Sequence, residues 1–204
     1  MSCFNLNLQG WRLILASKSP RRADLLREAG IKFEVRHSHF EENLPKNSFR
    51  GPVEYVESTA VAKGLDVFNT GLGDEERANA IVLAADTIVE GRPGDVWEKP
   101  KDEQEAAAML KSLSNRSHDV HTGVAIVYSD RVIRSFVVTT SVKFIELDDL
   151  TISEYVRGGS PMDKAGGYGV QDMFMVESIH GDYFNVVGMP ISRVLLELRD
   201  IVSK

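Results

Sequence analysis

A run of hydroxyl and guanidinium side chains stands where a predicted strand meets a predicted helix. The run is Ser17-Lys18-Ser19-Pro20-Arg21-Arg22, and it follows three apolar residues, 13–15. Ser19 suits an N-cap, and Pro20 suits the first helical position because its missing N–H is not needed there. Helix N-termini attract anions, and arginine binds phosphate oxygens through paired hydrogen bonds. The spacing predicts a polyphosphate site; the alternative is a capped surface helix with two solvated arginines.

A carboxylate interrupts the strongest strand signal in the chain. Residues 81–89 form an almost continuous apolar run, which is typical of a central strand covered on both faces. Asp86 stands inside this run, and a buried carboxylate is costly unless it is paired, bound to a cation or placed at a cleft. We interpret Asp86 as a catalytic or metal-facing acid at a strand's carboxyl end. The alternative is a structural aspartate that bonds to nearby backbone.

Three further charged residues could complete a phosphate site. Glu42 lies in the polar stretch 37–52, where it is either solvated or, since hard cations prefer carboxylate oxygens, part of a divalent metal site. Lys63 falls late on a predicted helix, and Lys99 falls on a strand-to-helix connection, a usual place for ligand contacts in α/β folds. Either lysine could reach phosphates or simply face solvent, and spacing alone does not decide.

A glycine-rich segment near the C-terminal end could approach a ligand closely. Residues 166–169 include three glycines, and Gln171 follows them. Glycine permits close backbone approach, and a side-chain amide offers a donor and an acceptor together, as a pyrimidine edge requires. The alternative for residues 160–171 is a flexible surface loop.

Composition describes an ordinary globular chain. It has 204 residues, 43% hydrophobic and 26% charged, with a net charge of −6. This length suits one large domain or two small ones, and the acidic balance argues against a surface that coats nucleic acid. The single cysteine, Cys3, indicates a reducing compartment. No apolar run reaches the ~18 residues of a membrane span, and residues 1–10 lack signal-peptide features, so we expect a cytoplasmic protein without a membrane partner.

The remaining pattern predicts the elements that would position these residues. A half-buried strand is expected over 31–35, and three more over 118–128, 132–140 and 141–147. A Ser129-Asp130 turn would join the strand over 118–128 to the strand over 132–140. A hairpin is expected of 174–180 with 183–187. One expected helix begins at Pro52, with Val53, Val56, Ala60 and Leu65 facing inward. Three others begin at a capping box of Asp102 and Glu105, at a second capping box of Thr151 and Glu154, and at Pro190. Residues 69–80 are expected to form a surface loop. His118 and His121 are three apart and would face opposite sides of a strand, so we discard a two-histidine metal site.

Six segments in this order and spacing resemble the Maf family of nucleoside triphosphate pyrophosphatases over about residues 12–200. They are Ser17-Lys18-Ser19-Pro20-Arg21-Arg22, Ala84-Ala85-Asp86-Thr87, Glu98-Lys99-Pro100, Thr122-Gly123-Val124, residues 163–171 and residues 181–188. The resemblance implies an α/β fold with a mixed central sheet, flanking helices and two lobes around a cleft, similar to inosine triphosphate pyrophosphatases. It implies one domain over residues 1–204, with an N-terminal extension at 1–10.

The resemblance also assigns roles to individual residues. The catalytic group is Asp86, Glu42 and Lys99; the substrate-binding group is Ser17, Ser19, Arg21, Arg22, Lys63 and Gln171; the metal ligands are Glu42 and Asp86. The implied cofactor is a divalent cation, with Mg²⁺ expected and Mn²⁺ or Co²⁺ as alternatives. Two residues depart from the family pattern: Asp172 stands where bacterial members usually have Gly, and Gly167 stands where Ala is common.

The segment that ends in Gln171 resembles the branch acting on dTTP and UTP rather than the sister branch that prefers 7-methyl-GTP. The resemblance therefore implies hydrolysis of dTTP and UTP, and of modified pyrimidine triphosphates in a house-cleaning role, to the monophosphate and pyrophosphate. It also implies a homodimer and no stable nucleic-acid partner. Two alternatives stay open: a regulatory module that binds nucleotides or nucleic acid, and a phosphatase that releases orthophosphate.

Overall fold

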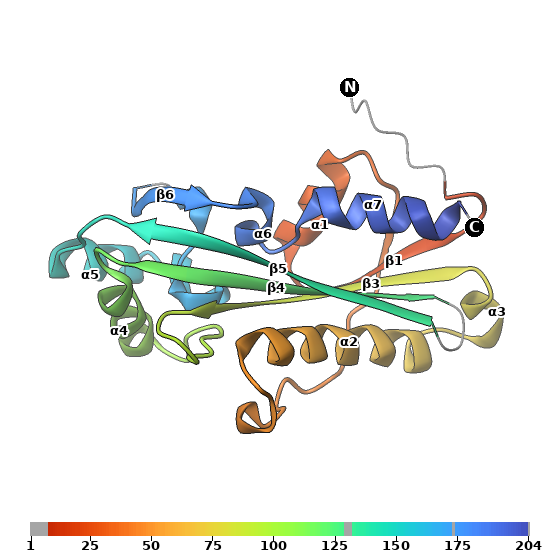
Figure 1. Ribbon diagram of the computed structural model, residues 1–204, viewed down its shortest axis with the longest axis horizontal. Coiled ribbons are helices and arrows are strands. Elements are labelled where there is room, and N and C mark those ends of the chain that lie inside the picture. The colour runs from red at the N-terminus through yellow and green to blue at the C-terminus, as the bar shows by residue number, and fades with distance from the viewer. Residues whose placement is uncertain (1–7, 129–131, 173, 204) are drawn as a thin grey trace.

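A single mixed sheet runs through the molecule (Figure 1). The computed structural model describes residues 8–128, 132–172 and 174–203. Six strands lie in the order β2-β1-β3-β4-β5-β6. The strands are β1 (Arg12–Ala16), β2 (Glu34–Val35), β3 (Ala80–Glu90), β4 (Ser117–Tyr128), β5 (Val132–Phe144) and β6 (Val176–His180). β1 is parallel to β2 and β3, whereas β3 to β6 pair antiparallel, which confirms the expected mixed sheet.

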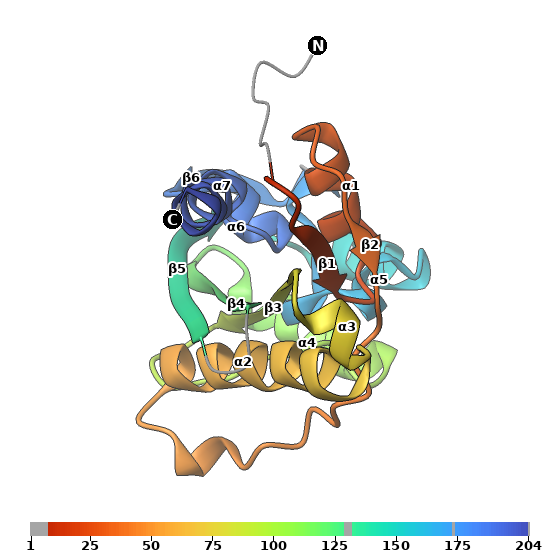
Figure 2. The ribbon, with the colours of Figure 1, turned by 90° about the vertical axis from the view of Figure 1, so that its right-hand side faces the viewer.

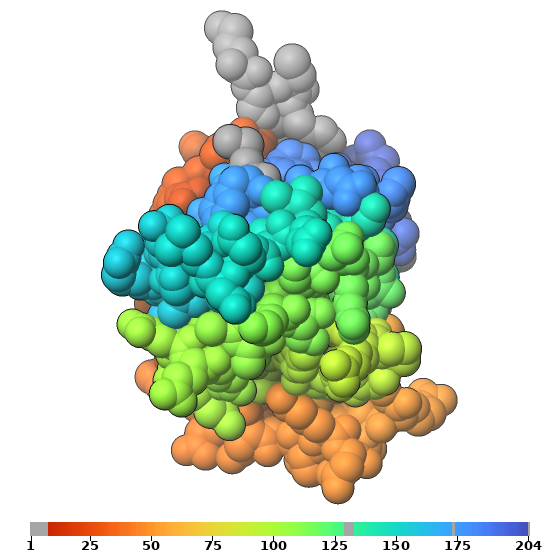
Figure 3. Space-filling view, turned by 90° about the vertical axis from the view of Figure 1, so that its left-hand side faces the viewer, coloured from red at the N-terminus to blue at the C-terminus, as the bar shows by residue number. Residues whose placement is uncertain are grey.

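Helices cover both faces of the sheet (Figure 2). One face carries α1 (Pro20–Glu28) and α7 (Ile191–Val202), whose buried side chains share a core with β1, β3 and β4. The other face carries α2 (Pro52–Thr70), which packs on β1, β3 and the end of β4. A further core joins α4 (Glu103–Leu113) and α5 (Asp149–Arg157) to the far end of the sheet. Figure 3 shows this end, with the green α4 segment beside the cyan α5 segment.

The shorter helices lie in the connections. They are η1 (Lys46–Ser48), α3 (Asp74–Arg77), η2 (Ser160–Asp163), η3 (Ala165–Gly167), η4 (Val170–Asp172) and α6 (Tyr183–Val187). The segment predicted as a surface loop over 69–80 therefore contains α3, and Leu72 within it is buried. None of the helices in the described ranges is both long and apolar enough to cross a bilayer.

Close approach of α2 to the sheet depends on a glycine in β4. Gly123 pairs with Asp86, and a Cβ on it would lie 2.5 Å from the carbonyl oxygen of Val56 in α2. Any larger residue would push the helix away from the sheet, because interiors are close-packed. Gly123 therefore sets the height at which α2 presents its side chains to β3.

Several predicted strands and apolar faces are wrong in detail. The strand expected over 31–35 is only β2, an edge strand whose Val35 is 42% exposed. Val53 was expected inward but is 45% exposed, because Pro52, Tyr55 and Val56 form the buried face at this end of α2 and Val53 lies on the outer face. The strands expected over 132–140 and 141–147 are one strand, β5, that ends at Phe144. The Ser129-Asp130 turn lies outside the described residues.

Two element starts are also corrected, both by aspartate caps. α5 begins earlier than its predicted capping box, because the Asp148 carboxylate accepts the N–H of Thr151 at 2.7 Å. The expected hairpin is a strand followed by helix α6, in which Asp182 accepts the N–H of Phe184 at 2.8 Å. A side-chain oxygen of this kind accepts the hydrogen bond of an N–H group in the first turn of a helix, and so favours a helix at that position. The Asp102 cap of α4, in contrast, is confirmed by its 2.7 Å bond from the N–H of Glu105.

A buried histidine stands at the far end of the sheet. His118 Nε2 lies 2.7 Å from the hydroxyl of Tyr168, and the imidazole packs edge-on against the ring of Phe144. Its Nδ1 has no hydrogen-bond partner in the described part of the chain, and burial lowers the pKa of His118 to about 4. His121, three residues on, bonds instead to Glu90 and Thr139, as expected for the opposite face.

We expect His118 to make stability depend on pH. Its pKa is near 4 in the folded protein, against about 6.5 in an unfolded chain, so the unfolded state binds more protons between these values. The free energy of unfolding should therefore fall by up to about 3 kcal/mol as pH drops from 6.5 to 4. Urea unfolding at several pH values measures this slope. His118→Gln should remove that part of the slope, and a variant with the wild-type slope would contradict the assignment.

The exposed His180 offers a control for the loss of one histidine. His180→Gln should retain the wild-type slope between pH 4 and 6.5, since its ring lies outside the core.

Candidate active site

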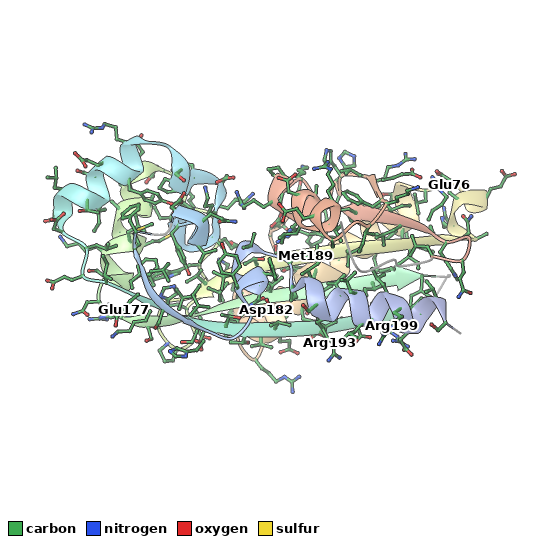
Figure 4. All side chains as sticks on the ribbon, turned by 90° about the horizontal axis from the view of Figure 1, so that it is seen from above. Glu76, Glu177, Asp182, Met189, Arg193 and Arg199 are labelled. Atoms are coloured by element: carbon green, nitrogen blue, oxygen red, sulfur yellow. The ribbon has the colours of Figure 1, made fainter. Side chains whose placement is uncertain are left out.

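One cavity of about 440 Å³ gathers the predicted site residues. It is bounded by the start of α1, the middle of β3 and the segment from η2 to η4, with α6 at its floor. In Figure 4 α5 (cyan) lies at one end of the molecule and α1 (red) near its middle, with α6, which follows the labelled Asp182, between them. The predicted residues all line this cavity: Ser17, Ser19, Arg21, Arg22, Glu42, Lys63, Asp86, Lys99 and Gln171.

The loop after β1 leaves the helix N-terminus open toward the cavity. β1 ends at Ala16, and the Ser17 hydroxyl then accepts the N–H of Ser19 at 3.1 Å. Ser19 occupies the N-cap position of α1, as predicted, but its side chain makes no capping hydrogen bond. The first-turn N–H groups of α1 and the Ser19 hydroxyl are therefore free to meet an anion, with the positive end of the helix dipole behind them.

A buried ion pair, Asp86 with Lys63, forms the second wall of the cavity together with the exposed Glu42. The ammonium nitrogen of Lys63 lies 2.7 Å from Asp86 Oδ1 and 2.8 Å from Glu42 Oε2. Asp86 and Lys63 expose only 6% and 9% of their surfaces. Burial raises the pKa of Asp86, and the neighbouring Lys63 and Arg22 oppose that rise. A carboxylate with a raised pKa is a stronger base than an ordinary aspartate, while the lysine keeps it ionised.

The two arginines of the loop differ in what they contact. Arg22 is half-buried and donates to the hydroxyls of Ser17 and Thr87 and to the carbonyls of Ala85 and Gly188, at 2.7–3.3 Å. Burial lowers the pKa of Arg22.

Four of the five guanidinium N–H groups of Arg22 thus bind the protein. Arg21 instead reaches across the cavity, where it donates to the Asp163 carboxylate at 2.6 Å and to the Asp163 carbonyl at 2.9 Å.

Two lysines of the cavity carry charges that the protein leaves uncompensated. Lys18 and Lys99 line the cavity and are exposed, and within the described ranges neither makes a hydrogen bond or ion pair. Lys99 was predicted as a site residue, whereas Lys18 was not, although it stands between two predicted serines. Asp163 was also missed as the partner of Arg21. No local signal could have found that pair, because 142 positions separate the two residues.

The donor set suits a divalent cation. Asp86 and Glu42 each place a carboxylate oxygen within 2.8 Å of the same atom, the Lys63 nitrogen. Hard cations such as Mg²⁺ prefer oxygen ligands of this kind. A second group, Glu90, Asp119 and His121, has ligand atoms within 4.8 Å of one another and could also hold an ion. None of this second group lines the cavity.

Comparison with known proteins gives three findings. The chain is 46% identical over 196 residues to a human protein named "Probable bifunctional dTTP/UTP pyrophosphatase/methyltransferase protein", covering 92% of this chain but only 31% of that protein. It is 45% identical over 192 residues to a "dTTP/UTP pyrophosphatase" of Salinibacter ruber, covering 92% of this chain and 89% of that protein. A solved dITP/XTP pyrophosphatase from Mycobacterium abscessus aligns with 92% of this chain and 99% of its own, at a TM-score of 0.43 and 16% identity, a distant likeness.

A family model fixes the relationship over nearly the whole chain. The model described as "Maf-like protein" matches residues 12–201, a range that holds the α1 loop, Asp86 and Gln171. With this match and relatives above 40% identity, the chain belongs to the Maf family.

Proposed function

We propose that this protein hydrolyses dTTP and UTP to the nucleoside monophosphate and pyrophosphate. The observation that carries the proposal is the buried Asp86 carboxylate, which faces a cavity whose other wall is an uncapped helix N-terminus. Its support from relatives is the name "dTTP/UTP pyrophosphatase" given to proteins at 43–45% identity. Modified pyrimidine triphosphates fit the same proposal and would make the protein a house-cleaning enzyme.

In this proposal Asp86 acts as the general base. It orients a water molecule for attack on the α-phosphorus and takes its proton, and pyrophosphate leaves. The raised pKa of Asp86 strengthens the base, and Lys63 holds the carboxylate in place at 2.7 Å. Glu42 pairs with Lys63 and so helps to hold the lysine beside Asp86. Little covalent chemistry is required of the protein, so positioning and charge stabilisation supply most of the rate.

The phosphates lie, in this proposal, against the start of α1. The Ser19 hydroxyl and first-turn N–H groups bind the phosphate oxygens, and Lys99 adds a free ammonium group. Arg22 fixes the loop between β1 and α1 through its bonds to the Ser17 hydroxyl and the Ala85 carbonyl. Arg21 gives two of its five N–H groups to Asp163, which leaves three that could reach a phosphate.

Asp86 and Glu42 would hold the divalent cation, for which we propose Mg²⁺. When bound, such an ion neutralises phosphate oxygens and acidifies a coordinated water. The Lys63 ammonium, which now lies between the two carboxylates, would then be released to bind phosphate oxygens, the role that the family resemblance implies for it.

We propose that the chain forms one domain over residues 1–204, associates as a homodimer and works in the cytoplasm without nucleic acid. A regulatory nucleotide-binding module would need no general base. The buried Asp86 beside Lys63 favours an enzyme over that alternative, because burying a charged group costs free energy and such a group usually has a functional role.

A pyrophosphate-release assay tests the proposal directly. We expect the purified protein with Mg²⁺ to release pyrophosphate from UTP and dTTP, and little from CTP, ATP, GTP and 7-methyl-GTP. Orthophosphate as the first product would identify a phosphatase instead. Release from 7-methyl-GTP alone would overturn the pyrimidine assignment. Nucleotide binding with no turnover would support a regulatory module.

Replacing the proposed base should stop turnover without preventing binding. We expect Asp86→Asn to lower kcat by about 10²–10⁴-fold, since this is the usual contribution of a general base, while calorimetry still detects UTP binding. Asp95→Asn is a matched control, because it changes a half-buried acid in the turn after β3, outside the cavity and outside the second acidic group. An Asp86→Asn enzyme with more than about half of the wild-type kcat would refute the role.

Removing the amide of Gln171 should weaken base selection. Gln171 lines the cavity with an exposed side chain, so Gln171→Ala should reduce the preference for UTP and dTTP over GTP by roughly tenfold, the value of one good hydrogen bond. The measurement is kcat/KM for each nucleotide. Gln104→Ala, an exposed glutamine on α4, should leave the preference unchanged. An unaltered substrate profile in Gln171→Ala would exclude it from base reading.

A further inference from the structure

The turn that carries Gln171 is tied to helix α5 through the next residue. Asp172 ends η4, and its Oδ2 accepts a short hydrogen bond from the hydroxyl of Tyr155 and a 3.1 Å bond from the hydroxyl of Ser160. Its backbone N–H donates to the carbonyl of Gly169 at 3.0 Å. The carboxylate therefore joins the turn to both α5 and η2.

Tyr155 holds the same turn at a second point. Its hydroxyl oxygen accepts the N–H of Gly169 at 3.2 Å while its proton goes to Asp172. Burial raises the pKa of Tyr155 to about 12, so the hydroxyl stays protonated and able to donate at neutral pH. The ring also meets Phe174 edge-on, at 5.6 Å between centroids. Both ends of the turn at 169–172 are thereby fixed to one side chain.

Gln171 has no such anchor of its own. Its side chain is exposed and lines the cavity, and it makes no hydrogen bond with another residue of the described ranges. The direction in which its amide points thus depends on the backbone of the turn, which Asp172 and Tyr155 fix.

The same hydrogen bonds continue to the phosphate side of the cavity. Lys164 Nζ donates to the Ser160 hydroxyl at 3.1 Å and to Asp163 at 2.8 Å, and Asp163 accepts from Arg21. An unbroken chain of polar contacts therefore runs from α1, through η2, to the turn that carries Gln171.

We propose that Asp172 is a positioning residue for base recognition, which holds the turn at 169–172 so that Gln171 presents its amide to the pyrimidine edge. The proposal rests on the function proposed above for the cavity. Asp172 touches no substrate in this scheme, and acts through the hydrogen bonds it accepts from Tyr155 and Ser160. Loss of these bonds should therefore affect which base is bound more than the hydrolytic step.

Two substitutions at this position separate positioning from charge. In Asp172→Ala the turn loses its anchor, and we expect KM for UTP and dTTP to rise about tenfold, kcat to change less than about twofold, and the preference over GTP to fall accordingly. In Asp172→Asn the amide oxygen can still accept from both hydroxyls, so most of the selectivity should return. Tyr155→Phe should resemble the alanine variant.

Controls keep the outcomes distinct. Asp149→Ala removes an exposed ion pair with Lys111 from the same helix and should leave selectivity unchanged. Thermal unfolding of each variant establishes that it is folded. Unchanged selectivity in Asp172→Ala, an equal loss of kcat with every nucleotide, or an asparagine variant no better than alanine would each overturn the inference. Failure of the wild-type protein to hydrolyse UTP or dTTP would instead overturn the proposed function.

Discussion

The burial of the Asp86 carboxylate is the constraint on which the site depends. A charge with only 6% of its residue exposed requires a counter-ion at contact distance, and Lys63 of α2 supplies it at 2.7 Å. Removing one member of such a buried pair typically costs about 3–5 kcal/mol. The lysine can reach β3 only if α2 lies low on the sheet. Gly123 permits this, and Gly64 does so from the helix side, where a Cβ would lie 3.1 Å from Val127.

The cavity exists because neighbouring strands end at different places. β1 stops at Ala16, opposite Ala84, whereas β3 continues to Glu90 with β4 as its partner. Between Ala84 and Val89, where Trp97 forms a bridge, one edge of β3 has no strand beside it, and the polar groups along this edge need other partners. Arg22 is such a partner, because it donates to the backbone carbonyl of Ala85 and to the side-chain hydroxyl of Thr87. An arginine in the phosphate-loop motif thus completes the sheet edge that the loop leaves open.

A feature of the fold or the site could be predicted from the sequence where the residues that determine it lie close together along the chain. The β1–α1 junction, the strand around Asp86 and the Asp102 cap depend on residues within a few positions of one another, and the structure confirms them. The strand predicted over 183–187 was wrong for two reasons: the local Asp182 cap starts a helix, and distant contacts hold Asn185 within it. Asn185 of α6 donates to the Val120 carbonyl and the Thr140 hydroxyl, at 3.0 and 2.9 Å. Such bonds leave no local pattern.

Charge compensation divides the cationic side chains of the cavity into two groups. Arg21, Arg22 and Lys63 are held by protein acceptors, so their positions are fixed before any ligand arrives. Lys18 and Lys99 are exposed and have no such acceptor in the described part of the chain. In a protein of net charge −6, local attraction for a polyphosphate then comes from these two ammonium groups, from Arg22, whose bonded acceptors are neutral, and from the open end of α1. Preorganised groups therefore set the geometry, while the uncompensated ones supply the attraction.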